Sequence, residues 1–323
     1  MFRPLLKIVP DTTNIDFMRA RGFAILLSLA LVIGSIALIA TRGLNFGVDF
    51  AGGQQFQATF TKAPEIDRLR NAVGGLNIGE PTIQQFGSPT EIAIRMPRPP
   101  EGVDEAQAAT RVQQTVRRLD PGVKFNAAET VSGKVSEELA WDGALALLIA
   151  MIGIAAYITV RFEWQFGVGA LVSLVHDLTI IIGFYALTQI EVSLNVVAAL
   201  LTLIGYSLND TVVVYDRIRE NLRRYRKMEI EPLLNLSVNE TLSRTIATNG
   251  AVLLAVLALV IFGPDTIYGL TIGIFTGVIV GTYSSIYVAR FLLVPLGVGP
   301  NSFLPRATAT GAERVTPNVE RGA

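Results

Sequence analysis

The chain has 323 residues, of which 50% are hydrophobic and 17% are charged, whereas soluble domains carry about 25% charged residues. Lysine plus arginine number 27, as do aspartate plus glutamate, so no net basic charge points to nucleic acid. There is no cysteine and only one histidine, which excludes disulfides, thiolate ligands and multi-histidine metal sites. No phosphate- or dinucleotide-binding glycine motif has a suitable strand-to-helix context. We therefore expect no cofactor, no metal and no enzymatic activity.

Six apolar segments are long enough to cross a membrane, because about 20 helical residues span ~30 Å of hydrocarbon. They are residues 22–40, 143–160, 166–187, 192–214, 246–263 and 266–289. The sequence therefore predicts a polytopic α-helical membrane protein with six transmembrane helices. Alternatively, residues 22–40 are a cleaved signal peptide, but the run is long for one and its removal would spoil the charge alternation described next.

Lysine and arginine in short connections set the orientation of the spans, since they concentrate on the cytoplasmic side. Basic residues precede the first span, and they also follow the second, the fourth and the sixth spans. We assign Arg290, which follows the sixth span, to the tail. The connections 188–191 and 264–265 have no basic residue. We expect the N-terminal segment 1–21, the connection 215–245 and a disordered polar tail, 300–323, to be cytoplasmic. Residues 41–142 are then extracytoplasmic.

This insert between the first two spans is long enough for one domain. Alternating and turn patterns predict strands at 53–60, 81–86, 90–96 and 123–131, and helices at 64–76 and 103–119. The order β-α-β-β-α-β is that of an α+β ferredoxin-like domain. No catalytic constellation occurs in it, so we expect a domain that binds or moves.

The fourth span has a polar face, on which Asn195, Thr202, Tyr206 and Asn209 fall together with small residues such as Ala198. Leu200, Leu201, Ile204 and Leu208 fall elsewhere on the helix. We expect the polar face to turn into a helix bundle and the leucine-rich side to face lipid.

Asp210 lies about 6 Å inside the cytoplasmic end of that span, at 1.5 Å per residue. Arg244 lies just outside the next span on the same side, after Ser237-x-x-Glu240, which has the form of a capping box at a helix start. Arg244 therefore has the reach to pair with Asp210. Asp210 then either binds and releases a proton as the bundle moves, or forms a static ion pair or lines a wet crevice.

Two further features lie inside predicted spans. His176 and Asp177 are at the middle of the third span, where a proton relay or an interhelical hydrogen bond would satisfy them, and we favour the hydrogen bond. In the sixth span, glycines repeat every four residues, at Gly269, Gly273, Gly277 and Gly281. Such a ridge favours close helix packing.

Four stretches resemble a known family. They are LNFGVDFAGG at 44–53, VSGKVSEEL at 131–139, SLNVVAALLTLIGYSLNDTVVVYDRIREN at 193–221 and NETLSRT at 239–245. They are similar to the SecF branch of the SecD/SecF family, in the resistance–nodulation–division superfamily. The resemblance extends from about residue 17 to 296.

The resemblance implies a bacterial inner-membrane subunit that acts with SecD beside the SecYEG channel. The pair would use the proton-motive force to complete preprotein export after SecA has acted. It also implies that Asp210 and Arg244 serve proton coupling. From their places inside the predicted spans, we expect supporting intramembrane polar groups at Asn195, Asn209, His176 and Asp177. Six spans are half of the usual twelve, so a SecD partner would be obligatory. A proton-driven exporter of small molecules or lipids and a non-transducing assembly factor are the alternatives.

Overall fold

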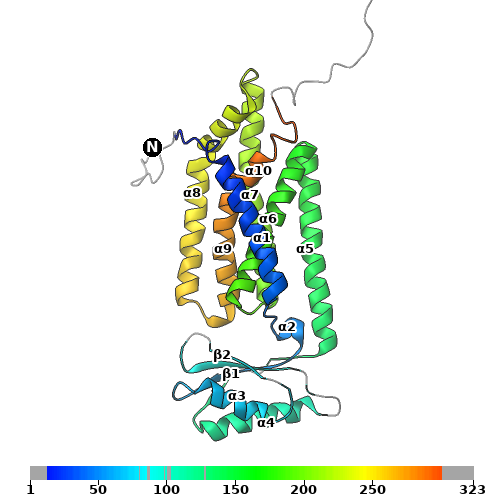
Figure 1. Ribbon diagram of the computed structural model, residues 1–323, viewed down its shortest axis with the longest axis vertical. Helices are drawn as coiled ribbons and strands as arrows, with labels where there is room; N and C mark the ends of the chain where they lie inside the picture. The colour runs from blue at the N-terminus through cyan, green and yellow to red at the C-terminus, as the bar shows by residue number, and fades with distance from the viewer. Residues whose placement is uncertain are drawn as a thin grey trace, which may run out of the picture.

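A computed structural model describes residues 13–79, 81–85, 88–97, 99, 103–126 and 129–299, so the expected tail 300–323 lies outside the described residues. Six long helices form a bundle above a small sheet (Figure 1). They are α1 (Arg21–Arg42), α5 (Gly133–Arg161), α6 (Trp164–Thr188), α7 (Leu194–Arg224), α8 (Ile230–Phe262) and α9 (Tyr268–Ile286), followed by the short α10 (Val288–Phe291). Each of the six is long and apolar enough to cross a membrane. The prediction of a six-span protein is confirmed.

The helices α7 and α8 run well beyond their apolar spans. They are joined by residues 225–229 alone, so most of the predicted connection 215–245 is helical. The capping-box interpretation is wrong, because Ser237 and Glu240 lie inside α8. The Ser237 hydroxyl donates to the Leu233 carbonyl at 2.8 Å, and the Glu240 carboxylate accepts from Arg217 Nε of α7 at 2.7 Å. Pairing between the two helical extensions uses the side chains that would otherwise cap an end.

The insert forms a sheet domain with the predicted α+β element order. Its elements are α2 (Val48–Ala51), β1 (Gly53–Thr59), α3 (Ile66–Gly74), β2 (Thr82–Gln85), β3 (Glu91–Met96), α4 (Glu105–Leu119), β4 (Lys124–Phe125) and β5 (Glu129–Val131). The antiparallel strands lie in the order β2-β3-β1-β4, and β5 also pairs with β1.

The last strand differs from the prediction of one continuous strand over 123–131. β4 pairs with Ala58 and Thr59 of β1, whereas β5 pairs with residues 53–55, and the register between these pairings shifts by one residue. An extra residue on one side of a ladder interrupts its hydrogen bonds, as in a β-bulge. The short α2 was not predicted.

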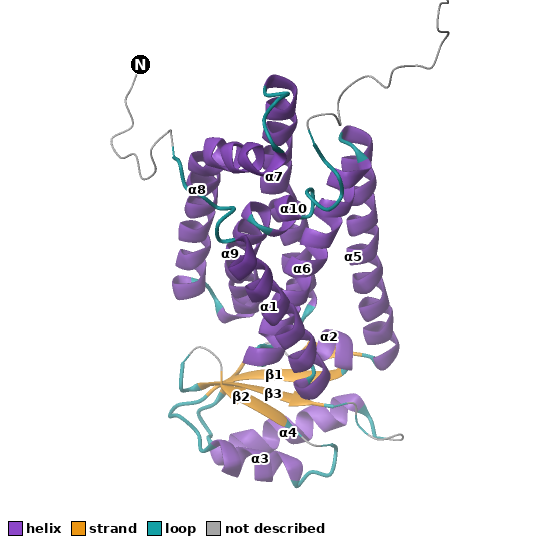
Figure 2. Cartoon of the chain, turned by 45° about the horizontal axis from the view of Figure 1, so that its top comes forward, coloured by secondary structure: helices purple, strands orange, loops and turns teal. Residues whose placement is uncertain are grey.

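Alternation along the strands gives the sheet two different faces. Phe56, Ile92 and Ile94 are buried in a core that also contains Leu69 of α3 and Val112 of α4. Both helices lie on the side of the sheet away from the bundle (Figure 2). The opposite face of the sheet therefore points toward the bundle and carries Gln55, Gln57 and Arg95. Gln54 is instead on the helix side, where it donates to the Glu105 carbonyl of α4 at 2.8 Å.

Candidate functional site

The orientation of α7 differs in part from the predicted one. Its polar and small residues are exposed in this chain, at Asn195, Ala198, Thr202, Gly205 and Asn209, which we call the polar stripe. The core instead receives the apolar side, including Leu200 and Ile204. This chain's own helices therefore do not cover the polar stripe, while Tyr206 of the predicted polar face reaches Asn249 of α8. That the stripe turns into a helix bundle stays a prediction. A transmembrane stripe of small and polar residues is the surface on which another helix packs.

The buried side of α7 packs against the glycine ridge of α9. The Cβ of an alanine at Gly277 would overlap the Leu203 side chain, and one at Gly281 would lie 3.2 Å from the Ser207 Cβ. At Gly269 a Cβ would make ordinary contact with Val196, and at Gly273 it would overlap the Tyr185 hydroxyl of α6. The ridge thus lets the α9 backbone approach α7 closely.

Asp210 is on this buried side of α7 and is only 4% exposed. Its carboxylate accepts a hydrogen bond of 2.6 Å from the side-chain amide of Asn249 on α8. The same amide nitrogen lies 2.5 Å from the Thr282 hydroxyl of α9, and the Tyr206 hydroxyl of α7 donates to the amide oxygen at 2.7 Å. One asparagine therefore links Asp210 of α7 to α8 and α9.

Arg244 is not brought to Asp210. Its side chain is exposed on α8, and among the described residues no hydrogen bond or ion pair joins it to that carboxylate. Residue 249 is five positions further along, about 500° of rotation at 100° per residue, which places it about 140° away around the helix. When Asn249 points at α7, Arg244 therefore points to the outside of the chain.

His176 and Asp177 belong to a second buried polar group. The Asp177 carboxylate accepts from the Ser207 hydroxyl of α7 at 2.6 Å and from the Ser284 hydroxyl of α9 at 2.7 Å. His176 Nδ1 lies 2.9 Å from the other Asp177 oxygen, and its ring stacks on Tyr283. These contacts join α6, α7 and α9 within one turn of Asp210.

The two remaining predicted polar residues lie on the polar stripe. Asn195 donates to the Thr266 carbonyl at 3.1 Å, while Asn209, although adjacent to Asp210 in sequence, is exposed. Within the described part of the chain, no group of three His, Cys, Asp or Glu residues has the geometry of a metal site.

A cluster at the other end of α7 ties the bundle to the sheet domain. The backbone N–H of Gly47 donates to the Val192 carbonyl at 2.8 Å, and the N–H of Val192 donates to the Asn45 carbonyl at 2.8 Å. Asp49 of α2 accepts from the backbone N–H of Leu194, the first residue of α7, at 2.8 Å. The segment after α1 thus holds the start of α7.

A side chain from the sheet domain completes this cluster. Arg95 of β3 forms an ion pair with Glu191, and it donates to the Phe46 carbonyl at 3.0 Å and to the Asn45 side chain at 3.2 Å. A Cβ at Gly47 would overlap the Glu191 carboxylate. We call Asn45, Asp49, Arg95 and Glu191 the latch, because it fixes the sheet domain to the α6–α7 connection.

Sequence reasoning missed Arg290, which it assigned to the tail. Arg290 is on α10 and is fully buried, with its guanidinium over the rings of Phe17, Tyr287 and Phe291 at 4.9–6.0 Å. An arginine directly after an apolar span normally indicates the membrane boundary, so the sequence gives no sign of its burial. The sequence analysis also missed Ser207 and Ser284, which bond Asp177, and Arg95 of the latch. A single polar residue in a span or a strand has many explanations.

Comparison with known proteins adds evidence of a different kind. The profile described as "Protein export membrane protein SecD/SecF, C-terminal" matches residues 111–298, and the "SecD/SecF GG Motif" matches residues 37–64. The chain is 42% identical to the "Protein translocase subunit SecF" of Cereibacter sphaeroides, over 91% of this chain and 93% of the relative. It is 39% identical to the subunit of that name from Vibrio alginolyticus, over 96% and 98%.

Solved structures of SecDF have the same fold. The crystal structure of SecDF from Thermus thermophilus, described as a translocon-associated membrane protein, matches with a TM-score of 0.82 and 32% identity. A structure of SecDF in a super-membrane-facing form matches with a TM-score of 0.67 and 32% identity. The matches cover 90% and 91% of this chain but only 39% and 40% of those chains, so this chain spans about two fifths of a SecDF protein.

Proposed function

The chain belongs to the SecD/SecF family of protein export membrane proteins, and on this premise we propose that it is the SecF subunit of a bacterial Sec export complex. Identity of about 40% to SecF subunits over nearly the whole chain carries this proposal. In it, the protein works in the inner membrane with SecD, SecYEG and SecA on preprotein substrates. Both termini are cytoplasmic, and the sheet domain is extracytoplasmic.

The polar stripe of α7 supports an obligatory SecD partner. Asparagine, threonine and small side chains are poor lipid contacts, whereas they are common where transmembrane helices pack together. The stripe lies next to the buried Asp210, and the exposed Arg244 is on the neighbouring helix. A partner helix on this surface would cover both and complete the polar environment around them.

In the proposed mechanism Asp210 binds and releases a proton that moves down the proton-motive force. An intramembrane carboxyl is costly and indicates a function by default. The Asn249 bond accepted at Oδ2 survives protonation of the other oxygen, whose new O–H then needs an acceptor. Loss or gain of this proton therefore changes what α7 must contact, which gives a physical reason for α7 to move.

The latch offers a route from that movement to the sheet domain. Leu194 begins the helix that carries Asp210, and Asp49 holds its backbone N–H. Glu191, just before that helix, pairs with Arg95 of the sheet domain. A shift of α7 along its axis would therefore pull on β3 through two charged contacts, and the sheet domain would hold or release the preprotein.

Reconstitution tests the proposed function. The full chain is co-purified with SecD and placed in proteoliposomes with SecYEG and SecA, and translocation of a preprotein is followed with and without an imposed proton gradient. We expect the gradient to raise the yield of translocated preprotein only when both subunits are present. Equal yields without this chain would contradict the proposal, and proton-driven efflux of a dye without SecYEG would favour a small-molecule exporter.

A further inference from the structure

A cavity of about 520 Å³ lies where the end of α5 meets the extension of α7, at the end of the molecule opposite the sheet. It is lined by Arg161, Asp216, Arg219, Glu220, Arg223 and Arg224. The α7 residues recur at spacings of three and four, which places them on one side of the helix. Arg161 is the last residue of α5. The cavity thus gathers guanidinium groups from two membrane-spanning helices.

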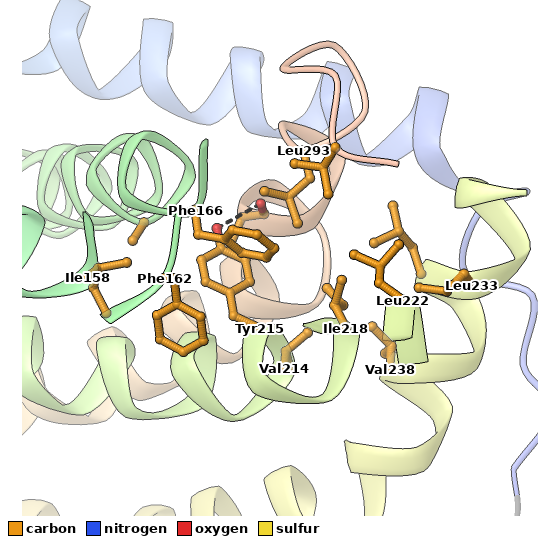
Figure 3. Close-up of a cluster of buried hydrophobic side chains, with 14 of the residues drawn as sticks. Ile158, Phe162, Phe166, Val214, Tyr215, Ile218, Leu222, Leu233, Val238 and Leu293 are labelled. Atoms are coloured by element: carbon orange, nitrogen blue, oxygen red, sulfur yellow. Dashed lines mark hydrogen bonds between the residues drawn. The ribbon is translucent and has the colours of Figure 1, made fainter. Parts of the chain in front are cut away.

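Two of these guanidinium groups are seated on the buried core. The ring of Phe162 lies under Arg161 at 5.2 Å and under Arg219 at 5.7 Å. Phe162 is itself buried and packs against Phe166 and Tyr215, as Figure 3 shows. Arg219 also donates to the Arg161 carbonyl at 3.3 Å. The positions of both arginines are therefore fixed by the fold.

The charge around the cavity favours an anion, since four arginines face two carboxylates. Glu220 accepts a hydrogen bond of 2.6 Å from Arg217, which is outside the lining, and Asp216 is 3.9 Å from Arg161. Glu163 is outside the lining but interacts with two of its arginines. Burial raises the pKa of Glu163, although Arg219 and Arg223 act to lower it. Planar guanidinium groups bind phosphate oxygens with paired hydrogen bonds.

The surface beside the cavity identifies the kind of phosphate. Tyr157 is one helical turn before Arg161 and is 57% exposed, Val160 is 87% exposed, and Trp164 at the start of α6 is 56% exposed. Exposed tyrosine and tryptophan at a helix end are typical of the membrane interface. A free phosphate ion would use the arginines alone, whereas a phospholipid would also lay its acyl chains along the exposed side of α5.

We propose that this cavity binds the phosphate of an anionic phospholipid headgroup. Basic pockets between transmembrane helices are a recurring form of such sites. The lipid would tie the α5–α6 connection to the extension of α7. The proposal requires only that the chain spans a membrane, so it can hold or fail independently of proton coupling through Asp210.

Native mass spectrometry of the detergent-purified full chain tests the proposal, with phosphatidylglycerol and phosphatidylcholine as the probes. The cavity variants are Arg223→Gln/Arg224→Gln on α7 and Arg161→Gln on α5. The matched control is Arg226→Gln/Lys227→Gln, which removes two exposed positive charges just beyond α7. Size exclusion and circular dichroism establish that each variant is folded.

We expect the wild-type chain and the control to retain phosphatidylglycerol at least 5-fold better than phosphatidylcholine, and the α7 double variant to lose that preference. Arg161→Gln should also weaken the preference for phosphatidylglycerol, because Arg161 reaches the same cavity from α5. Equal losses in control and cavity variants would overturn the proposal, since they would indicate general surface charge. Displacement of the lipid by millimolar inorganic phosphate would also overturn it in favour of a free-anion site.

Discussion

Asn249 of α8 donates a hydrogen bond of 2.6 Å to the carboxylate of Asp210 on α7. The contacts of the amide favour this orientation, because its oxygen accepts from Tyr206 and its nitrogen also contacts the Thr282 oxygen. Thr282 in turn donates to the Val278 carbonyl at 2.6 Å. Asn249 therefore presents an N–H to the Asp210 carboxylate, and it makes the carboxyl a shared element of α7, α8 and α9.

Replacing Asn249 should weaken the bundle itself. Asn249→Ala leaves the Asp210 carboxylate buried without this donor, which costs about 1–3 kcal/mol for a buried unsatisfied group. Thermal unfolding of the purified chain in detergent measures the loss as a lower Tm. The control is Asn209→Ala, the exposed asparagine next to Asp210, which should leave the Tm unchanged. Equal changes in Tm for the two substitutions would show that the hydrogen bond from Asn249 to Asp210 does not stabilise the bundle.

The same substitution at two glycines on facing helices should affect different properties of the chain. Gly277→Leu inserts a side chain where Leu203 already lies, and overpacking of this kind costs about 1–3 kcal/mol. Gly205→Leu projects from the polar stripe, where no atom lies within 4 Å of an added Cβ. Gly277→Leu should therefore lower the Tm of the lone chain.

Gly205→Leu should leave the Tm of the lone chain unchanged and reduce co-purification with SecD. Tm measurements on the lone chain and pull-down with tagged SecD separate the two effects. Normal SecD binding by Gly205→Leu would remove the polar stripe from the partner interface.

The latch should hold the sheet domain at a fixed distance from the bundle. Because the chain has no cysteine, spin labels can be placed at Gln107→Cys on α4 and Leu187→Cys on α6 without background. Arg95→Gln removes the ion pair to Glu191 and should broaden the distance distribution between the labels. A double-mutant cycle with Glu191→Gln compares the free energies of unfolding of the variants. The coupling energy between Arg95 and Glu191 should be about 1.5–3 kcal/mol, as for hydrogen bonds to charged groups.

The control for the latch is Arg111→Gln, an exposed arginine on α4 that should leave the distribution narrow. A narrow distribution in Arg95→Gln as well would mean that the hydrogen bonds between the Gly47 and Val192 backbones hold the domain without the ion pair.

The stability of the sheet domain should depend on pH through Asp120. The backbone N–H and the hydroxyl of Thr61 both donate to Asp120 at 2.7 Å, and they hold the pKa of this carboxyl below its usual value of 3.8. A lowered pKa stabilises the fold above the pKa of the unfolded chain, and this stabilisation is lost as the pH falls through the lower, folded value.

We therefore expect Asp120→Asn to lower the Tm of the chain at pH 6, and the difference from the wild type to shrink as the pH falls below 3.8. Glu137→Gln, an exposed carboxylate change on α5, should show no such convergence. A Tm difference for Asp120→Asn that stays constant with pH would contradict the role of the Thr61 bonds.

The sequence predicts the six spans and most of the sheet domain because each depends on local pattern. A membrane requires a long apolar helix wherever the chain crosses it, and strands alternate with period two. The face that α7 turns to its own bundle is not local information. Amphipathicity indicates a polar stripe but does not say which helices cover it, and Asn195 and Asn209 are exposed in this chain.

The neighbours of Asp210 were mispredicted for a related reason. Complementary charge suggested Arg244, whereas helix geometry turns Asn249 toward α7 and Arg244 away. The contacts of Arg95 and Arg290 depend on tertiary packing between segments far apart in the chain. Nothing in the local pattern around Arg95 or Arg290 distinguishes either from an ordinary surface arginine.

The most direct test of proton coupling is the proton-gradient-stimulated export given by Asp210→Asn, which keeps the side-chain volume and removes the titrating group. The chain, SecD, SecYEG and SecA are reconstituted, and Asp142→Asn, an exposed change on α5, is the control. We predict that Asp210→Asn assembles with SecD and exports preprotein at the rate seen without a gradient, while the control is stimulated fully. Full stimulation of Asp210→Asn would contradict the account and leave the protein as a scaffold.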